Sequence, residues 1–254
     1  MKLTGNTILI TGGGSGIGRA LAEKFHSNGN KVIITGRNQA KLDSVATSHP
    51  GMESLVLDLL DSDAIVTFAK LVKHNYADLN VVIHNAGIMK TEKIGETEIS
   101  IAESQIITNL LGPIRLNNVL LPLLLDQPDS TIMTVTSGLA FLPLSLNPTY
   151  SATKAAIHSY TQSLRYQLKD SSTEVIELVP PYVRTTLTGD QQANDSAAMP
   201  LEDFIDEVWS ILEKDPNVQE ICVERVQMQR TAESSGDYST RYKNFNEMMV
   251  KART

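Results

Sequence analysis

The chain has little of what several classes of protein depend on. It has one cysteine among 254 residues, Cys222, so it can form neither an intrachain disulfide nor a cysteine cluster for zinc. Its longest apolar run, VLLPLLL at 119–125, is broken by proline and is far shorter than the roughly 20 residues that a membrane helix needs. The N-terminal stretch MKLTGNTILIT lacks the extended apolar region of a signal peptide. We therefore expect a cytoplasmic protein without a membrane segment or a metal centre.

Positive charge is also scarce. The chain carries 22 basic and 29 acidic residues, a formal net charge of −7, and it has no concentrated basic tract. This charge argues against nucleic acid as a partner, because a broad cationic face is what binds the phosphate backbone. A smaller polyanionic ligand would have to be held by local groups, since the field of the whole protein opposes it.

The sequence is instead rich in short apolar segments that alternate with helical ones. We expect strands at 7–11, 31–36, 54–59, 80–87, 131–137, 174–180 and 218–224. Helices are expected between them, including 39–47, 62–74, 98–125 and 200–215. Short β-branched strands that alternate with helices predict a parallel sheet covered on both faces. The expected fold is a single α/β domain over residues 1–254, a doubly wound, seven-stranded Rossmann sheet.

Three segments deviate from this regular alternation. Pro113 lies inside the long helical region and should kink it. Residues 185–200 are polar and without periodicity, which is typical of a mobile or functional loop, here a substrate loop. Residues 225–254 form a polar, partly helical C-terminal tail that is available to pack on a neighbouring subunit.

A glycine-rich turn, TGGGSGIG at 11–18, joins the first strand to the first helix. In an open α/β sheet this is where dinucleotides bind, because glycines let the backbone approach a pyrophosphate at a helix N-terminus. A flexible turn without a ligand is the alternative. The position of the turn at the start of a βαβ unit favours a cofactor.

Together with this turn, four further motifs resemble the short-chain dehydrogenase/reductase family. They are HNAG at 84–87, Asn109, Ser137 and YSATK at 150–154, and they occur in the family's order and spacing. The segments 178–185, 199–216 and 223–238 are similar to the branch of this family named after the teichoic-acid D-alanylation locus. The resemblance implies an oxidoreductase that interconverts a ketone or aldehyde with an alcohol.

The end of the second strand decides which nicotinamide cofactor is expected. A carboxylate there would select NAD by accepting hydrogen bonds from the ribose, but this chain has Gly36 followed by Arg37. Arg37 can offer a bidentate cation to a 2′-phosphate, and Arg19 is a second candidate for the same group. A solvated surface arginine is the alternative. We predict NADP(H).

The resemblance places further residues along the cofactor. Asp58 would bind the adenine amino group, and Val183 and Thr185 the nicotinamide carboxamide. The full predicted cofactor set is Gly12, Ser15, Gly16, Ile17, Gly18, Arg19, Arg37, Asp58, Leu59, Asn85, Ala86, Gly87, Tyr150, Lys154, Pro180, Val183 and Thr185. His84 stands where the family usually has asparagine, and we assign it no catalytic role.

Tyr150 and Lys154 lie four residues apart, so on a helix they share one face. This spacing also occurs in inert surface helices. By the resemblance, Tyr150 is the general acid in reduction and the base in oxidation, and Lys154 lowers its pKa and holds the nicotinamide ribose. Ser137 would donate to the substrate oxygen, and Asn109 would distort its helix and hold a water. Asn109, Ser137, Tyr150 and Lys154 are the predicted catalytic residues.

The expected substrate is a fairly hydrophobic small carbonyl compound or alcohol. The predicted walls of its site are Ile88, Met89, Tyr182 and the apolar segment GLAFLPLSLNP at 138–148, with the 185–200 loop. By the resemblance, the helices at 98–125 and 150–168 would form a homodimer or homotetramer. A redox-silent NADP(H)-binding sensor or scaffold of the same fold is the alternative, although such a protein is not expected to keep the tyrosine–lysine pair. Epimerases of nucleotide sugars generally need a longer C-terminal domain.

Overall fold

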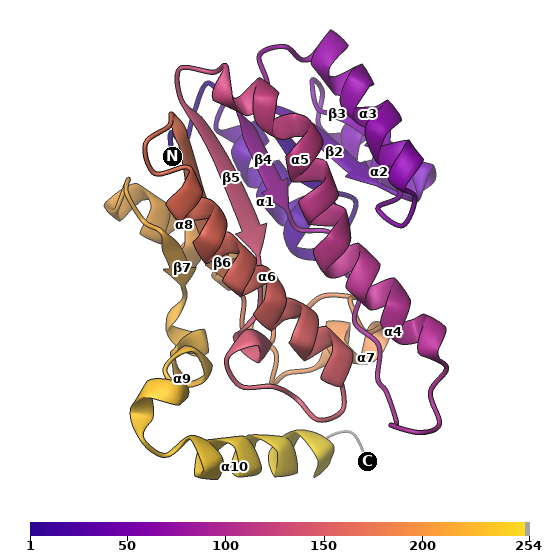
Figure 1. The fold of residues 1–254 in the computed structure, drawn as a ribbon, viewed down its shortest axis with the longest axis vertical. Helices are drawn as coiled ribbons and strands as arrows, with labels where there is room; N and C mark the ends of the chain where they lie inside the picture. Colours follow the sequence, from indigo (N-terminus) through magenta and orange to yellow (C-terminus); the bar gives the residue numbers. More distant parts are fainter. Residues whose placement is uncertain (252–254) are drawn as a thin grey trace.

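The computed structural model describes residues 1–251 and contains one parallel sheet of seven strands. The strands are β1 (Thr7–Thr11), β2 (Lys31–Gly36), β3 (Glu53–Val56), β4 (Val81–His84), β5 (Ser130–Val135), β6 (Thr173–Val179) and β7 (Glu220–Cys222), in the order β3-β2-β1-β4-β5-β6-β7 (Figure 1). Every neighbouring pair is parallel. The order reverses between β1 and β4, which creates the crevice at the carboxyl ends where such sheets bind ligands.

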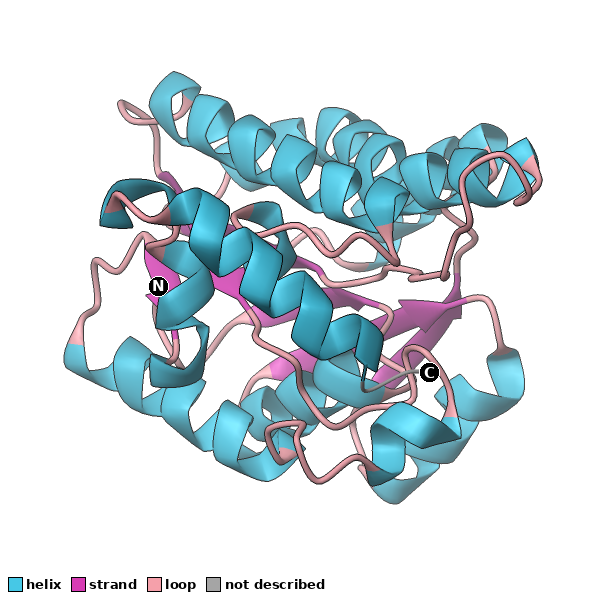
Figure 2. Ribbon diagram, turned by 90° about the horizontal axis from the view of Figure 1, so that it is seen from below, coloured by secondary structure: helices cyan, strands magenta, loops and turns pink. Residues whose placement is uncertain are grey.

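Helices cover both faces of the sheet (Figure 2). One face carries α1 (Gly16–Ser27), α2 (Gln39–Ser48) and α8 (Leu201–Lys214), packed on a core that includes Phe25, Ile34 and Phe204. The other carries α3 (Ser62–Asn75), α5 (Gly112–Leu125) and α6 (Pro148–Gln167), around Val82, Leu116 and Leu164. Burial of strands on both faces explains their continuous apolar sequences. The predicted doubly wound α/β fold is confirmed. None of the described helices is long and apolar enough to cross a membrane.

The third strand is shorter than the sequence predicted. β3 ends at Val56, and the predicted strand residues 57–59 lie in the connection to α3. The Leu57 amide still bonds to the Gly36 carbonyl, but the Asp58 carboxylate then accepts the Leu60 amide at 3.0 Å, which starts a turn. Asp58 and Leu59 are therefore loop residues.

The predicted long helix at 98–125 is interrupted. It consists of α4 (Ile99–Ile106), a π-helical turn η1 (Ile107–Leu111) and α5. The structure places a π-helical turn directly before Pro113, with the Gly112 amide donating to the Ile107 carbonyl five residues earlier. Pro113 itself has no N–H to donate to the Asn109 carbonyl. The irregular turn is centred on Asn109, and Pro113 follows it in the first turn of α5.

The segment at 185–200 is more ordered than the loop that the sequence predicted. It contains the short helix α7 (Asp190–Asn194). Its far end returns beside its start, because Met199 forms a parallel bridge with Val183 and the Arg184 amide donates to the Met199 carbonyl at 2.8 Å. The loop formed by residues 185–200 follows β6 in the chain and borders the crevice.

The C-terminal tail packs on its own chain. After η3 (Glu224–Val226), it forms α9 (Gln227–Arg230), η4 (Glu233–Ser235) and α10 (Tyr238–Lys251), and residues 252–254 of the predicted tail lie outside the described residues. α10, yellow in Figure 1, crosses the end of the molecule where the strands finish. Asn246 bonds there to the Ser145 amide at 2.6 Å and to the Pro143 carbonyl at 3.1 Å. The tail thus covers the segment that follows Ser137.

Candidate active site

A cavity of about 390 Å³ lies at the carboxyl ends of the strands. Its lining comes from the turn after β1, the ends of β2, β4 and β5, the start of α6 and the segment after β6. Most of the predicted site residues line it: Gly12, Ser15, Gly16, Ile17, Arg37, Leu59, Asn85, Ala86, Gly87, Ser137, Tyr150, Lys154, Pro180, Val183 and Thr185. Residues from across the chain therefore converge on one site.

The glycine turn is shaped by close backbone approach. Gly12 has φ of +70°, a conformation that residues with a side chain rarely adopt. A Cβ on Gly18 would overlap the Asn85 side-chain amide and lie 2.5 Å from the Gly12 carbonyl oxygen. Asn85 itself donates to the Thr11 carbonyl at 2.9 Å, which ties the end of β4 to the turn. The turn leaves a side-chain-free groove at the N-terminus of α1, which fits a pyrophosphate.

At the end of β2, Arg37 is exposed and lines the cavity, next to Asn38, whose side chain caps α2 by accepting the Lys41 amide at 3.0 Å. Lys41 also lines the cavity and was missed by sequence reasoning, although its position one helical turn after Arg37 was visible.

Arg19 lies outside the lining residues and pairs with Glu23 at 2.7 Å, an i,i+4 ion pair on α1. Asp58 also lies outside the lining, between Leu57 and Leu59, which belong to it.

Tyr150, Lys154 and Ser137 meet at the reacting end of the cavity. The Lys154 ammonium lies 5.5 Å from the centre of the Tyr150 ring and donates to the Val135 carbonyl at 2.7 Å. The Ser137 hydroxyl is hydrogen-bonded to the Tyr150 phenol and accepts the Leu139 amide at 3.1 Å. All three side chains are at least nine-tenths buried, so water has little access to them.

The pKa values of this pair differ from the sequence expectation. Burial raises the pKa of Tyr150 to about 12, and the hydrogen bond from Ser137 opposes this rise. Burial also lowers the pKa of Lys154 to about 8, against an opposing effect of the Glu177 carboxylate. In the protein alone the phenol is therefore held protonated, because desolvation raises its pKa by more than the Ser137 hydrogen bond lowers it.

Asn109 connects the chain after β4 to helix α6 through hydrogen bonds of its side chain. Its side-chain carbonyl accepts the Ile88 amide at 2.8 Å, and its amide donates to the Ile88 carbonyl at 2.9 Å and to the Thr153 hydroxyl at 3.1 Å. Thr153 in turn donates to the Tyr150 carbonyl at 2.7 Å. The π-helical turn thus brings Asn109 against both the strand end after β4 and the helix that carries Tyr150 and Lys154.

The opposite wall comes from the segment after β6. Val183 and Thr185 line it as predicted, and Gln192 of α7 supports them. The buried Gln192 side chain donates to the Val183 carbonyl at 2.8 Å and accepts the Thr188 amide at 3.0 Å. Sequence reasoning did not predict that Gln192 supports this wall, because nothing in the local sequence indicates that its side chain points back toward the end of β6.

The predicted substrate walls are only partly assembled as expected. Ile88 lines the cavity, and Met89, Leu142 and Leu144 join Tyr150 in one buried apolar cluster. Phe141 instead faces the other way, with its ring 4.6 Å from that of His158. Ala232 and Phe245 of the tail complete the apolar cluster, a contribution that sequence reasoning missed.

His84 is a buried residue of β4. The buried His84 donates from Nε2 to the Asn117 side-chain carbonyl at 2.6 Å, and burial lowers its pKa to about 4, so it is a neutral strand residue that packs against α5. Among residues 1–251 there is no cluster of three or more His, Cys, Asp or Glu side chains that could hold a metal ion.

A parallel sheet with a glycine turn after β1 and a Ser–Tyr–Lys group at the crevice defines a dinucleotide-binding oxidoreductase. The model of the short chain dehydrogenase family matches residues 6–196, and the chain belongs to this family. The uncharacterized oxidoreductase DltE of Bacillus subtilis is 38% identical over 251 residues, 97% of this chain and 98% of the relative. An uncharacterized oxidoreductase of Staphylococcus aureus is 31% identical over 88% of this chain and 99% of its own.

Solved structures agree with this assignment. A short chain dehydrogenase from Shigella flexneri complexed with NADP has a TM-score of 0.73 and 26% identity, and the match covers 79% of this chain and 87% of that one. A family member from Burkholderia phymatum in complex with NAD shares the fold at a TM-score of 0.80 and 18% identity, over 94% and 96% of the chains. The family therefore binds NAD in some members and NADP in others.

Proposed function

We propose that the protein is an NADP(H)-dependent carbonyl reductase that acts on a fairly hydrophobic ketone or aldehyde. The observation that carries the proposal is the end of β2, where Gly36 and the exposed Arg37 border the cavity in place of a carboxylate. A guanidinium matches the geometry of a 2′-phosphate, while a carboxylate would repel it. Lys41 adds a second cation to this wall. The NADP complex of the Shigella flexneri relative is consistent with this choice.

When bound in the cavity lined by the glycine turn, Tyr150 and Lys154, the cofactor would supply a hydride for the carbonyl carbon. The chain's own residues handle the oxygen. The Ser137 hydroxyl donates to the substrate oxygen and orients it. Tyr150, held protonated by burial, delivers its proton to that oxygen as the alcohol forms.

Lys154 then stabilises the phenolate that remains. Its ammonium, held by the Val135 carbonyl, lies beside the ring that becomes negative. Asn109 holds Ile88 on one side and Thr153 on the other, which fixes the helix that carries both residues. The apolar cluster of Met89, Leu142, Leu144 and Phe245 beside Tyr150 favours a hydrophobic substrate over a charged one.

Absorbance at 340 nm with NADPH or NADH and a panel of aryl and aliphatic ketones tests the proposal. We expect turnover with NADPH, weak turnover with NADH, and loss of turnover in Tyr150→Phe. Arg37→Gln should raise the KM for NADPH about tenfold or more and leave the KM for NADH unchanged, because only the phosphate contact is lost. Arg115→Gln is the matched control, since Arg115 lies on α5 and outside the cavity lining.

Two results would contradict the proposal. Equal effects of Arg37→Gln on both cofactors would remove the argument for NADP(H). Tight NADPH binding without turnover of any ketone, unaffected by Tyr150→Phe, would instead support a redox-silent sensor.

A further inference from the structure

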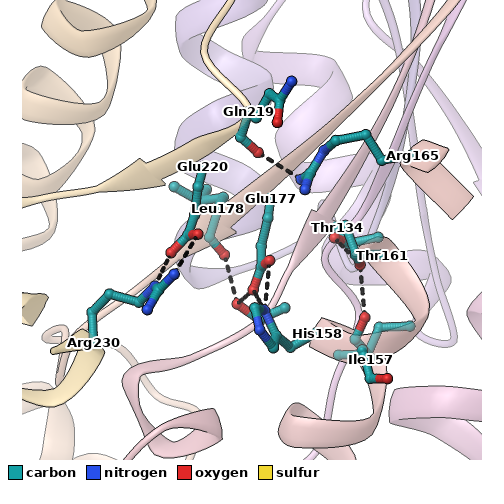
Figure 3. Close-up of polar contacts among 12 residues, drawn as sticks. Thr134, Ile157, His158, Thr161, Arg165, Glu177, Leu178, Gln219, Glu220 and Arg230 are labelled. Carbon is teal, nitrogen blue, oxygen red and sulfur yellow. Dashed lines mark hydrogen bonds and ion pairs between the residues drawn. The ribbon is translucent and has the colours of Figure 1, made fainter. Parts of the chain in front are cut away.

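A buried carboxylate lies behind the candidate site. Glu177 of β6 is 1% exposed, and the structure gives it two partners (Figure 3). The Thr136 hydroxyl donates to Glu177 Oε1 at 2.7 Å, and His158 Nδ1 lies 2.9 and 2.8 Å from the two carboxylate oxygens. An ionised carboxylate is costly to bury, so a site that keeps one fully hydrogen-bonded calls for an explanation.

Both partners of Glu177 belong to the elements that carry the reacting groups. Thr136 stands between Val135, whose carbonyl accepts the Lys154 ammonium, and Ser137. His158 is one helical turn beyond Lys154 on α6. Glu177 itself lies outside the residues that line the cavity. It therefore touches neither cofactor nor substrate, but it joins the end of β5 to the helix of Tyr150 and Lys154.

The other carboxylate in this region already has a cation. Glu220 of β7 forms an ion pair with Arg230 of α9, and the Arg230 guanidinium lies 4.6 Å from the centre of the Phe141 ring. His158 packs against the same ring. Arg230 thus offsets the charge of Glu220, whereas the Glu177 carboxylate is held by Thr136 and His158 and favours the charged form of Lys154.

We infer that Glu177 is a positioning residue of the reductase site, which holds the Val135–Ser137 strand end through Thr136 and supplies a buried negative charge for the Lys154 ammonium. The inference rests on the roles given to Ser137 and Lys154 in the proposed function. An apolar pair of similar volume would pack β6 against α6 at lower cost, so the retained charge indicates a role beyond packing.

The direction of the charge effect follows from the surroundings of Lys154. Burial lowers the Lys154 pKa to about 8, and Glu177 raises it. The other ionisable groups in this region are Tyr150 and His158 on α6, Glu220 and Cys222 on β7, and Arg230 on α9. Without Glu177, Lys154 would lose its proton nearer neutral pH, and a neutral lysine stabilises a phenolate less well.

The test compares Glu177→Gln with Glu174→Gln, an exposed carboxylate on the same strand. The pKa of Lys154 is measured directly by NMR of protein labelled with [ε-¹³C]lysine, the resonance being assigned by its absence in Lys154→Arg. We expect the Lys154 midpoint to fall by on the order of one pH unit in Glu177→Gln and to stay in place in Glu174→Gln. The alkaline limb of kcat should move by the same amount.

Two further variants separate charge from position. Glu177→Asp keeps the charge and should return the Lys154 midpoint toward that of the unmodified protein. Thr136→Val keeps the charge but loses the strand contact, so it should lower kcat several-fold without moving the midpoint.

An unchanged midpoint in Glu177→Gln, or an equal shift in Glu174→Gln, would overturn the charge role, and unchanged kcat in Thr136→Val would overturn the positioning role. If Glu177→Gln does not fold, Glu177→Met, which also removes the charge at similar volume, takes its place: a lowered Lys154 midpoint supports the charge role, and an unmoved midpoint overturns it. If no ketone is turned over by the unmodified protein, the proposed function fails, while the NMR midpoint still decides whether Glu177 acts on Lys154.

Discussion

At the scale of single residues, burial decides the chemistry of the site more than charge does. Tyr150 and Lys154 are one turn apart, and the same desolvation moves their pKa values away from each other, to about 12 and about 8. Burial therefore holds the phenol protonated at neutral pH, while the ammonium loses its proton more readily than a solvent-exposed lysine does. A spacing of four residues shows that the groups meet, but their protonation depends on neighbours that come from other strands.

Gly18 should be intolerant of even the smallest side chain. A Cβ there would overlap the Asn85 amide and the Gly12 backbone carbonyl, and the backbone cannot shift without a large energetic cost. We expect Gly18→Ala to cost about 1–3 kcal/mol of unfolding free energy and to weaken NADPH binding at least tenfold. Urea denaturation and fluorescence titration measure the two effects.

Gly14→Ala is the control within the same turn, because its nearest neighbour is the flexible Leu42 side chain at 3.4 Å. Equal stability and affinity in both variants would show that the turn does not depend on the close approach at Gly18.

His84 should make the protein sensitive to acid. Its pKa in the folded state, about 4, lies below the value of about 6.5 in an unfolded chain, so the unfolded state takes up the proton first as the pH falls. The free energy of unfolding should therefore fall between pH 6.5 and pH 4, with a His84 contribution of up to about 3 kcal/mol. Urea denaturation at a series of pH values in this range should show a flatter profile for His84→Asn than for the unmodified protein. His74→Asn, at an exposed position on α3, should leave the profile as it is. Parallel profiles for all three proteins would contradict this account.

At the scale of elements, the π-helical turn between α4 and α5 is the feature that organises the site. It directs Asn109 toward Ile88 and Thr153, three hydrogen bonds that a regular helix at this register is not built to make. Because Pro113 withholds one backbone donor, the irregular turn costs less here than it would elsewhere in the helix.

Asn109 should therefore matter for stability as well as for turnover. Asn109→Leu has a similar volume but leaves the Ile88 amide and carbonyl without partners, which should cost about 2–4 kcal/mol and lower kcat at least tenfold. Thermal unfolding and ketone turnover are the measurements. Asn118→Leu, at an exposed position on α5, should change neither by much. A stable but inactive Asn109→Leu protein would mean that the side chain serves the reaction alone.

The elements also show how far sequence reasoning reaches. Alternating apolar segments predicted all seven strands, because a doubly wound sheet buries each strand on both faces and leaves a continuous apolar run. The motifs at strand ends predicted the site, since the carboxyl ends of parallel strands meet at one edge. Two predicted cofactor residues, Asp58 and Arg19, lie outside the cavity lining, and both make local contacts that the sequence did not predict. The Asp58 carboxylate accepts the Leu60 amide after an early end to β3, and Arg19 pairs with Glu23 one turn further along α1.

Contributions that sequence reasoning missed depend on distant contacts. Gln192 lines the cavity and Phe245 joins the apolar cluster with Tyr150, yet both come from segments whose local sequence is polar. The docking of α10 depends on Asn246 bonding to residues about 100 positions earlier, which no local pattern reveals.

At the scale of the whole molecule, the C-terminal tail packs beside the site. α10 packs over the segment after Ser137, and Phe245 belongs to the apolar cluster that includes Tyr150. This cluster is therefore built from two regions far apart in sequence, one of which is a peripheral helix with many exposed residues.

Loosening this helix should affect the substrate more than the cofactor. Phe245→Ala removes the main apolar anchor of α10, so the amides of α10 should exchange with solvent about tenfold faster or more, and the KM for a ketone should rise while the KM for NADPH stays constant. Hydrogen–deuterium exchange with mass spectrometry and steady-state kinetics test this. Met248→Ala changes a residue of the same helix that is 58% exposed and should leave both unaltered. Faster exchange without any change in the KM for the ketone would show that α10 covers no part of the substrate site.

The strand order has a consequence for how the molecule comes to be folded. β1 lies inside the sheet between β2 and β4, where Ile8 pairs with Val32 on one side and with Val81 on the other. During synthesis β1 gains its first neighbour early, but its second edge has no native partner until β4 has left the ribosome. In that interval a short apolar strand offers unpaired backbone groups, and such edges are where nascent chains associate wrongly. A strand that is buried throughout in the finished protein thus depends on protection while the chain is being made.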